Sequence, residues 1–245
     1  MAPEGPEATT AREQDFVLFQ GLRDTRGALE RWAAAPSQVL GGWFTGAVLV
    51  AIGLLTATWL ISLISTPDPT PAFIPGVTWP VEGADLVHIL GRNLLVLALH
   101  ATACVAGFIA GASLPLAAED MTGFKRFIHE KAGPVAIGWV ALVTTFSLVA
   151  QSIALGFYAS TLSFQLDMPS WLLMLTVLPH ALLELTAVFL PLAAWLIASR
   201  RGEWADLLAA TFATVAIALP MLLVSAILEL YLWPRLLEMA SPALL

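Results

Sequence analysis

Charged side chains are scarce in this sequence. Asp, Glu, Lys and Arg make up 12% of its 245 residues, about half of the roughly 25% found in a typical soluble domain. Hydrophobic residues make up 58%, and the mean hydropathy is +0.82. This composition excludes a disordered protein and an ordinary soluble enzyme, because both need far more charge. An integral membrane protein remains.

Basic residues and cysteines are also few. The chain has 11 Lys and Arg residues and a net charge of −7, so no basic surface is large enough to neutralise a phosphate backbone. We therefore expect no nucleic-acid partner. A single cysteine, Cys104, cannot form an internal disulfide, and no Cys and His residues have zinc-finger spacing. We expect neither a metal site nor a cofactor.

Long apolar runs are abundant. A helix crosses the hydrocarbon core, about 30 Å thick, with roughly 20 mostly apolar residues, and none of the runs alternates as a barrel strand does. The sequence therefore predicts an all-α bundle of five transmembrane helices over residues 43–235. The five predicted spans are residues 43–64, 93–117, 134–160, 171–199 and 206–233.

The positive charges predict the orientation. Nine of the eleven Lys and Arg residues lie before the first span, between spans two and three, or between spans four and five. Only Arg92 and Arg235 lie on the other side. Since positive residues favour the cytoplasmic side, we expect a multi-pass protein of the plasma (inner) membrane. Its N-terminus is cytoplasmic and its short tail, residues 236–245, lies outside.

Two segments outside the spans have distinctive compositions. Residues 1–12 are rich in Pro, Glu, Ala and Thr and are expected to be disordered within a cytoplasmic leader of 42 residues. Asp15 to Trp32 predicts an amphipathic helix, which either lies flat on the inner leaflet or packs in the cytosol. The outside loop from Thr66 to Gly91 holds five of the sixteen prolines, which predicts stiff, extended structure.

Seven polar residues lie inside or at the edge of the predicted spans. Ionisable groups in a bilayer cost at least about 2.5–3.5 kcal/mol each on insertion scales. The predicted topology places all seven in the outer half of the membrane, on four different spans. The predicted polar cluster consists of Arg92, Asn93, His100, Gln151, His180, Glu184 and Glu229.

This cluster has several interpretations. It is a hydrogen-bond and ion-pair network in which Arg92 neutralises Glu184 or Glu229, or it lines a cavity or pathway for a polar ligand or a proton. A metal site of His100, His180 and Glu184 lacks any supporting motif. Intramembrane hydrolysis is disfavoured, because no nucleophile elbow is present. We therefore expect no catalytic residue.

Prolines and small residues bear on helix shape and packing. Pro179 kinks the fourth span or begins a new half-helix, in which case residues 171–178 form an outside or re-entrant turn. Pro191 and Pro220 mark further kinks. In the second span Ala103, Gly107 and Gly111 form a small-residue stripe, which serves either packing within the chain or contact in a homo-oligomer.

Three short segments resemble, in the same order, the stage II sporulation protein M family. The segment from Pro179 to Leu185 resembles its Pro-His-Gly…Glu signature, with Ala181 where the family usually has glycine. The segment from Gly91 to Leu94 resembles the Asn-containing start of its second span. The segment from Glu229 to Pro234 resembles the Glu…Pro ending of its last span. The similarity covers about residues 85–235.

The resemblance implies a polytopic membrane protein without enzymatic activity. The matching positions are Arg92, Asn93, His180, Glu184 and Glu229. The expected function is that of a membrane scaffold or partner-recruiting subunit of a cell-envelope complex, with partners in the membrane or envelope besides the bilayer itself. A rival hypothesis is a transport component that uses the polar cluster as a cavity for a solute, a lipid or a proton. An intramembrane metal-binding or hydrolytic protein is the third.

A reporter fusion tests the orientation. A reporter that is active only in the periplasm, fused after Leu245, is expected to be active, because five spans and the charge distribution both place the C-terminus outside. The same reporter fused in the loop after Arg201 is the control and is expected to be inactive. The reverse pattern of activity would overturn the predicted orientation.

Overall fold

The computed structural model describes residues 23–115 and 122–244 of the chain. Within these residues the secondary structure is helical, and residues 23–34 also form a helix. The α helices are α2 (Pro36–Ser62), α3 (Gly83–Phe108), α5 (Gly123–Gln165), α6 (Ser170–Arg201), α7 (Leu207–Ile227) and α8 (Trp233–Ala240). Shorter turns are η1 (Ile109–Ser113) and η3 (Leu228–Leu232), which are π-helical, and η2 (Trp204–Asp206) and η4 (Pro242–Leu244), which are 3₁₀.

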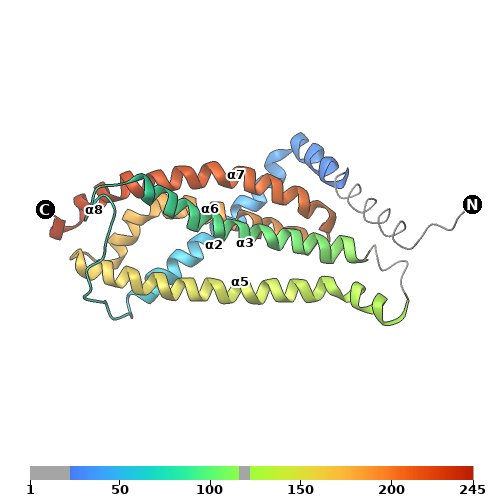
Figure 1. Ribbon diagram of the computed structural model, residues 1–245, viewed down its shortest axis with the longest axis horizontal. Helices are drawn as coiled ribbons and strands as arrows, with labels where there is room; N and C mark the ends of the chain where they lie inside the picture. Colours follow the sequence, from blue (N-terminus) through green and yellow to red (C-terminus); the bar gives the residue numbers. More distant parts are fainter. Residues whose placement is uncertain (1–22, 116–121, 245) are drawn as a thin grey trace, which may run out of the picture.

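Five of these helical segments are long and apolar enough to cross a membrane, which confirms the predicted fold class. They are Pro36–Ser62, Gly83–Ser113, Ile137–Gln165, Ser170–Arg201 and Trp204–Ala240. The helices run along one long axis (Figure 1). The α2–α3 loop, the α5–α6 turn and α8 lie at one end, here named the C-terminal end of the bundle. The helix of residues 23–34 and the α6–α7 turn lie at the opposite end.

Several helices extend beyond the predicted spans, because charge and proline end an apolar run but not necessarily a helix. The second span was predicted to begin at Asn93, yet α3 begins at Gly83. The third span was predicted to begin at Pro134, yet Pro134 lies inside α5, which begins at Gly123. A helix outside the hydrocarbon core tolerates proline, since water can satisfy the carbonyl that loses its donor. The tail was predicted to follow residue 235. In the structure α8 continues to Ala240, and Leu237 is fully buried.

The structure also decides the shape of the fourth span. α6 runs without interruption from Ser170, so residues 171–178 are its first two turns and not a re-entrant segment. Pro179 and Pro191 both lie inside α6, and Pro220 lies inside α7. Each proline removes one backbone hydrogen bond from its helix.

The core of the protein surrounds the C-terminal half of α6. All ten residues from Thr186 to Trp195 are buried, although a membrane helix usually exposes one face to lipid. α2, α3 and α7 enclose this segment (Figure 1). Small residues allow the close approach: a Cβ added at Gly46 on α2 would lie 3.1 Å from the Cβ of Ala193. Without water to drive burial, tight packing of this kind holds membrane helices together.

α5 is the most peripheral helix. It lies along the edge of the bundle in Figure 1 and packs mainly against α2. Gly156 makes the closest approach, since an added Cβ would lie 2.5 Å from Ile61 and 3.0 Å from the Thr58 carbonyl oxygen. Large apolar side chains such as Trp139 and Phe146 are exposed on α5. In a bilayer these side chains face lipid.

The proline-rich loop from α2 to α3 is extended, as predicted, and closes the C-terminal end of the bundle. Gln165 on α5 anchors it, because its Oε1 atom accepts from the Ala72 N–H at 2.7 Å and its Nε2 atom donates to the Thr70 carbonyl at 2.6 Å. The Thr70 N–H also donates to Asp68 at 2.8 Å, which lowers the pKa of that carboxyl. These bonds hold Ile74, which is buried, over the helices below.

At the opposite end, the helix of residues 23–34 packs against the bundle. The rings of Trp32 and Trp43 lie 5.0 Å apart and nearly perpendicular. Nη2 of Arg31 donates to both carboxylate oxygens of Asp206, at 2.8 and 2.9 Å. The described part of the predicted amphipathic helix therefore packs against the bundle. Its beginning and the predicted disordered leader lie outside the described residues.

The small-residue stripe of α3 packs within the chain. Gly107 is buried against α6 and α7: an added Cβ would lie 2.8 Å from Trp195 Nε1 and 2.7 Å from Leu207. An added Cβ at Gly111 would overlap the Trp204 ring. Ala103, one turn before Gly107, is half-buried. These contacts use the stripe for intramolecular packing.

Gly107→Ala is expected to destabilise the protein by about 1–3 kcal/mol, because the Trp195 indole cannot move without disturbing the α6 core. Gly91→Ala on the same helix is the matched control, since an added Cβ there meets nothing within 4 Å. Alanine at this position should leave stability unchanged or raise it slightly. Thermal unfolding in detergent measures both variants, and equal melting temperatures would contradict the packing argument.

Candidate functional site

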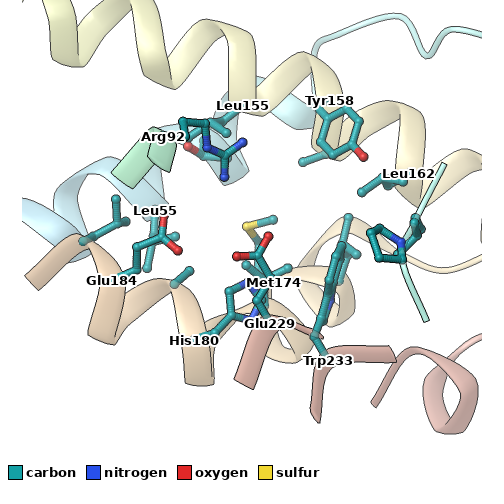
Figure 2. Close-up of a pocket in the computed structure, with 18 of the residues that line it drawn as sticks. Leu55, Arg92, Leu155, Tyr158, Leu162, Met174, His180, Glu184, Glu229 and Trp233 are labelled. Atoms are coloured by element: carbon teal, nitrogen blue, oxygen red, sulfur yellow. The ribbon is translucent and has the colours of Figure 1, made fainter. Parts of the chain in front are cut away.

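A cavity of about 310 Å³ lies among the helices toward the C-terminal end of the bundle. Ile74 and Pro75 of the α2–α3 loop lie over it. Its polar lining consists of Arg92, Thr58, Tyr158, His180, Glu184 and Glu229. Its apolar lining includes Leu55, Leu155, Leu162, Met174 and Trp233 (Figure 2).

Different helices supply the charged groups. His180 and Glu184 are four residues apart on α6, so they lie on one face of that helix. Arg92 comes from α3. By helix rise, Arg92 lies about 14 Å from the start of α3, and His180 about 15 Å from the start of α6. The charged groups on α3 and α6 therefore lie at a similar depth along the bundle, although Arg92 itself is exposed.

Glu229 enters the cavity from the π-helical turn η3. Pro234 follows this turn and has no N–H for the Leu230 carbonyl four residues earlier. Gly76, with φ of +81°, packs against Pro234, so that an added Cβ would lie 2.8 Å from its ring. π turns inside α helices occur frequently at functional sites, because the extra residue changes where side chains point.

The three charged side chains are close but unpaired. Arg92 interacts electrostatically with both Glu184 and Glu229, and the two glutamates interact with each other. Figure 2 shows the guanidinium and both carboxylates facing the same space. Among the described residues, no hydrogen bond or ion pair joins any two of them. Glu229 Oε2 is buried and has no hydrogen-bond partner there.

His180 is also without a polar partner. Its side chain lines the cavity and is only 7% exposed. Its ring packs beside Trp233, with 5.5 Å between the ring centroids. Trp233 in turn donates from Nε1 to Thr176 Oγ1 at 3.3 Å, which orients the indole. No other residue in the described part of the chain forms a hydrogen bond with the His180 imidazole.

Three residues of the predicted polar cluster do not line the cavity. Asn93 is buried beside Glu184, and its Nδ2 atom lacks a hydrogen-bond partner of ordinary geometry. The His100 ring packs 5.3 Å from that of Phe189. Gln151 donates to Ser147 Oγ on its own helix at 2.9 Å. The cluster was grouped by depth, and depth alone does not say which face of a helix a side chain occupies.

Sequence reasoning also missed two cavity residues, Tyr158 and Trp233. Tyr158 lies seven residues after Gln151, which is two helical turns, and is close enough to Arg92 and Glu229 to interact electrostatically. Trp233 was interpreted only as a span-end residue of the aromatic belt. A search for aromatic residues one or two turns from the intramembrane charges would have found both.

Within residues 23–115 and 122–244, no group of three His, Cys, Asp or Glu side chains is placed to hold a metal ion. His100, one of the three ligands considered, lies outside the cavity. Cys104 is buried, and its Sγ donates to the Pro191 carbonyl at 3.2 Å.

Residues 132–234 match the family model described as stage II sporulation protein M. Over this segment the chain is similar to that family. No curated protein and no solved structure matches it. The matched segment contains four of the six polar cavity residues, which are Tyr158, His180, Glu184 and Glu229. Thr58 and Arg92 lie before it.

The stability of a Glu229→Gln variant distinguishes between two roles of the charged residues, a structural network and a binding site. If the carboxylate has no structural partner, removing its charge should leave the free energy of unfolding unchanged or raise it by up to about 2–3 kcal/mol. Thermal unfolding in detergent measures the change. Asp206→Asn is the matched control, because it removes a paired carboxylate and should cost up to about 1 kcal/mol. A clear loss of stability for Glu229→Gln would indicate a structural network.

Proposed function

We propose that this SpoIIM-like chain is a non-enzymatic membrane scaffold of a cell-envelope complex, and that its cavity binds a charged group of a ligand or partner. The observation that carries the proposal is the set of unpaired charges in the cavity. Arg92, Glu184 and Glu229 face one space without forming ion pairs. Charges at membrane depth are retained in proteins mainly for function.

The energetics favour binding over a purely structural role. Each ionisable group costs at least about 2.5–3.5 kcal/mol at membrane depth. A structural network would lower this cost through direct hydrogen bonds between the three charged groups. No such bond joins them among the described residues, and Glu229 Oε2 has no partner there. A bound group that contacts all three would satisfy them, in the way that active and binding sites sacrifice stability for function.

Transport is the second candidate, because several helices contribute ionisable side chains to one cavity. The other half of the bundle argues against a continuous path. There the buried segment of α6 from Thr186 to Trp195 fills the centre, and a large hydrophobic cluster packs around it. A polar solute that left the cavity in that direction would meet close-packed side chains instead of polar groups. A binding role therefore fits the cavity better than a pathway does.

Photo-cross-linking in cells tests the proposal. A photoreactive residue in place of Leu155, which lines the cavity, is expected to capture a discrete species that mass spectrometry can identify. Adding Glu184→Gln should reduce capture by about tenfold or more, because a charge-assisted contact is worth about 1.5–3 kcal/mol. Replacing Leu142, which is exposed on the same helix, by the photoreactive residue is the matched control and should capture only bulk lipid.

Two results would contradict the proposal. Equal capture from positions 155 and 142 would show that the cavity holds nothing specific. A solute flux across liposomes that Glu184→Gln abolishes would favour transport over the scaffold.

A further inference from the structure

A second hollow adjoins the cavity. It is a groove of about 250 Å³ between α2 and α6, and its lining includes Ile52, Trp59, Trp171 and Leu178. Leu55 and Met174 line both the groove and the cavity. The charged cavity and the apolar groove are therefore neighbours that share two side chains.

The groove faces outward from the bundle. Ile52 is 47% exposed and Trp171 is 54% exposed, and both belong to membrane-spanning helices. In a bilayer such a surface meets hydrocarbon and not water. Its apolar and aromatic walls suit an alkyl chain, which has no polar atom to satisfy.

The charges that line the cavity favour a ligand head group that carries both a positive and a negative charge. Glu184 and Glu229 are two carboxylates against the single guanidinium of Arg92, so their formal charges leave an excess of one negative charge. Ionised carboxylates only accept hydrogen bonds, and a primary ammonium brings three donors. The guanidinium only donates, and its planar fork matches a phosphate. One head group that carries an ammonium and a phosphate satisfies all three side chains.

The remaining polar and aromatic lining points to a ligand as well. His180 is more than nine-tenths buried, lines the cavity and has no hydrogen-bond partner among the described residues. Its imidazole can donate to or accept from a head group. Trp233 and Tyr158 present aromatic rings to the same space, and aromatic faces attract ammonium groups.

We propose that the cavity and the groove together bind one membrane amphiphile that carries a primary ammonium and a phosphate, as an aminophospholipid does. The head group lies among Arg92, Glu184 and Glu229, and one alkyl chain lies in the groove between α2 and α6. This inference rests on the proposed function, because it names the ligand of the same cavity.

Native mass spectrometry of the full chain in detergent tests the inference. The probes are three phospholipids with the same acyl chains: phosphatidylethanolamine, phosphatidylcholine and phosphatidylglycerol. Phosphatidylcholine has the same charge as phosphatidylethanolamine but no N–H donor, and phosphatidylglycerol has no amine. The protein is expected to retain phosphatidylethanolamine about tenfold more tightly than either of the others, as the loss of one charge-assisted contact predicts.

Two variants test the binding of the head group and the binding of the alkyl chain separately. Glu229→Gln should abolish the preference for the amine. Thr56→Trp places a bulky side chain in the groove, which Thr56 lines, and should weaken binding of every phospholipid. It should not change binding of soluble phosphoethanolamine, which has no chain. Leu142→Trp, at an exposed position of α5, and Gln151→Leu, at a polar position outside the cavity, are controls and should leave all binding unchanged.

Several outcomes would overturn the inference. Equal retention of the three phospholipids, unaffected by Glu229→Gln, would identify them as bulk lipid, and preferred retention of phosphatidylglycerol would exclude the proposed head group. Binding of phosphoethanolamine without any phospholipid preference would show that no alkyl chain binds in the groove. If neither probe binds while the cross-link from position 155 persists, the inference fails and the proposed function stands.

Discussion

The enclosure of α6 is the constraint on which the rest of the structure depends. From Thr186 to Trp195 every side chain of this helix is buried, so α2, α3 and α7 must pack around it. Small residues make this possible, as at Gly46 against Ala193 and at Gly107 against Trp195. With three helices held on α6, the peripheral α5 needs only α2 as its main support. Van der Waals contact, and not the exclusion of water, holds such a bundle together.

The N-terminal half of α6 is packed less closely than its C-terminal half. There the close packing gives way to the cavity, and α6 presents His180 and Glu184 to it. The contrast between the two halves gives the molecule one polar chamber and one dense apolar half. The chamber is covered by the proline-rich loop, which Gln165 and Gly76 fix in position. A site built in this way can hold a charged group at membrane depth without opening a path through the bundle.

Much of the fold follows from hydropathy alone, because a bilayer forces each long apolar run into a helix whose backbone bonds are satisfied internally. The ends of the helices are harder to predict from hydropathy. α5 begins at Gly123, eleven residues before the predicted apolar run, and α8 continues the last span, since helix formation needs hydrogen bonds and not hydrophobicity. For the candidate site, the residue types Arg92, His180, Glu184 and Glu229 could be predicted. The depth of Arg92 could not, because α3 begins at Gly83 and not at the predicted start of the second span, Asn93. Which faces the four residues occupy could not be predicted either, so His100 and Gln151 were grouped with them while Tyr158 was missed.

The sequence by itself determined the number of spans, the ends at which positive charge gathers and the presence of costly intramembrane charges, because each of these depends on composition along the chain. Only the tertiary structure decided that Arg92, Glu184 and Glu229 share a cavity yet form no pairs, and that an apolar groove adjoins it. Those features depend on the rotation of each helix about its axis and on the π turn that carries Glu229. Both result from packing between segments far apart in the chain, which no local pattern of residues encodes.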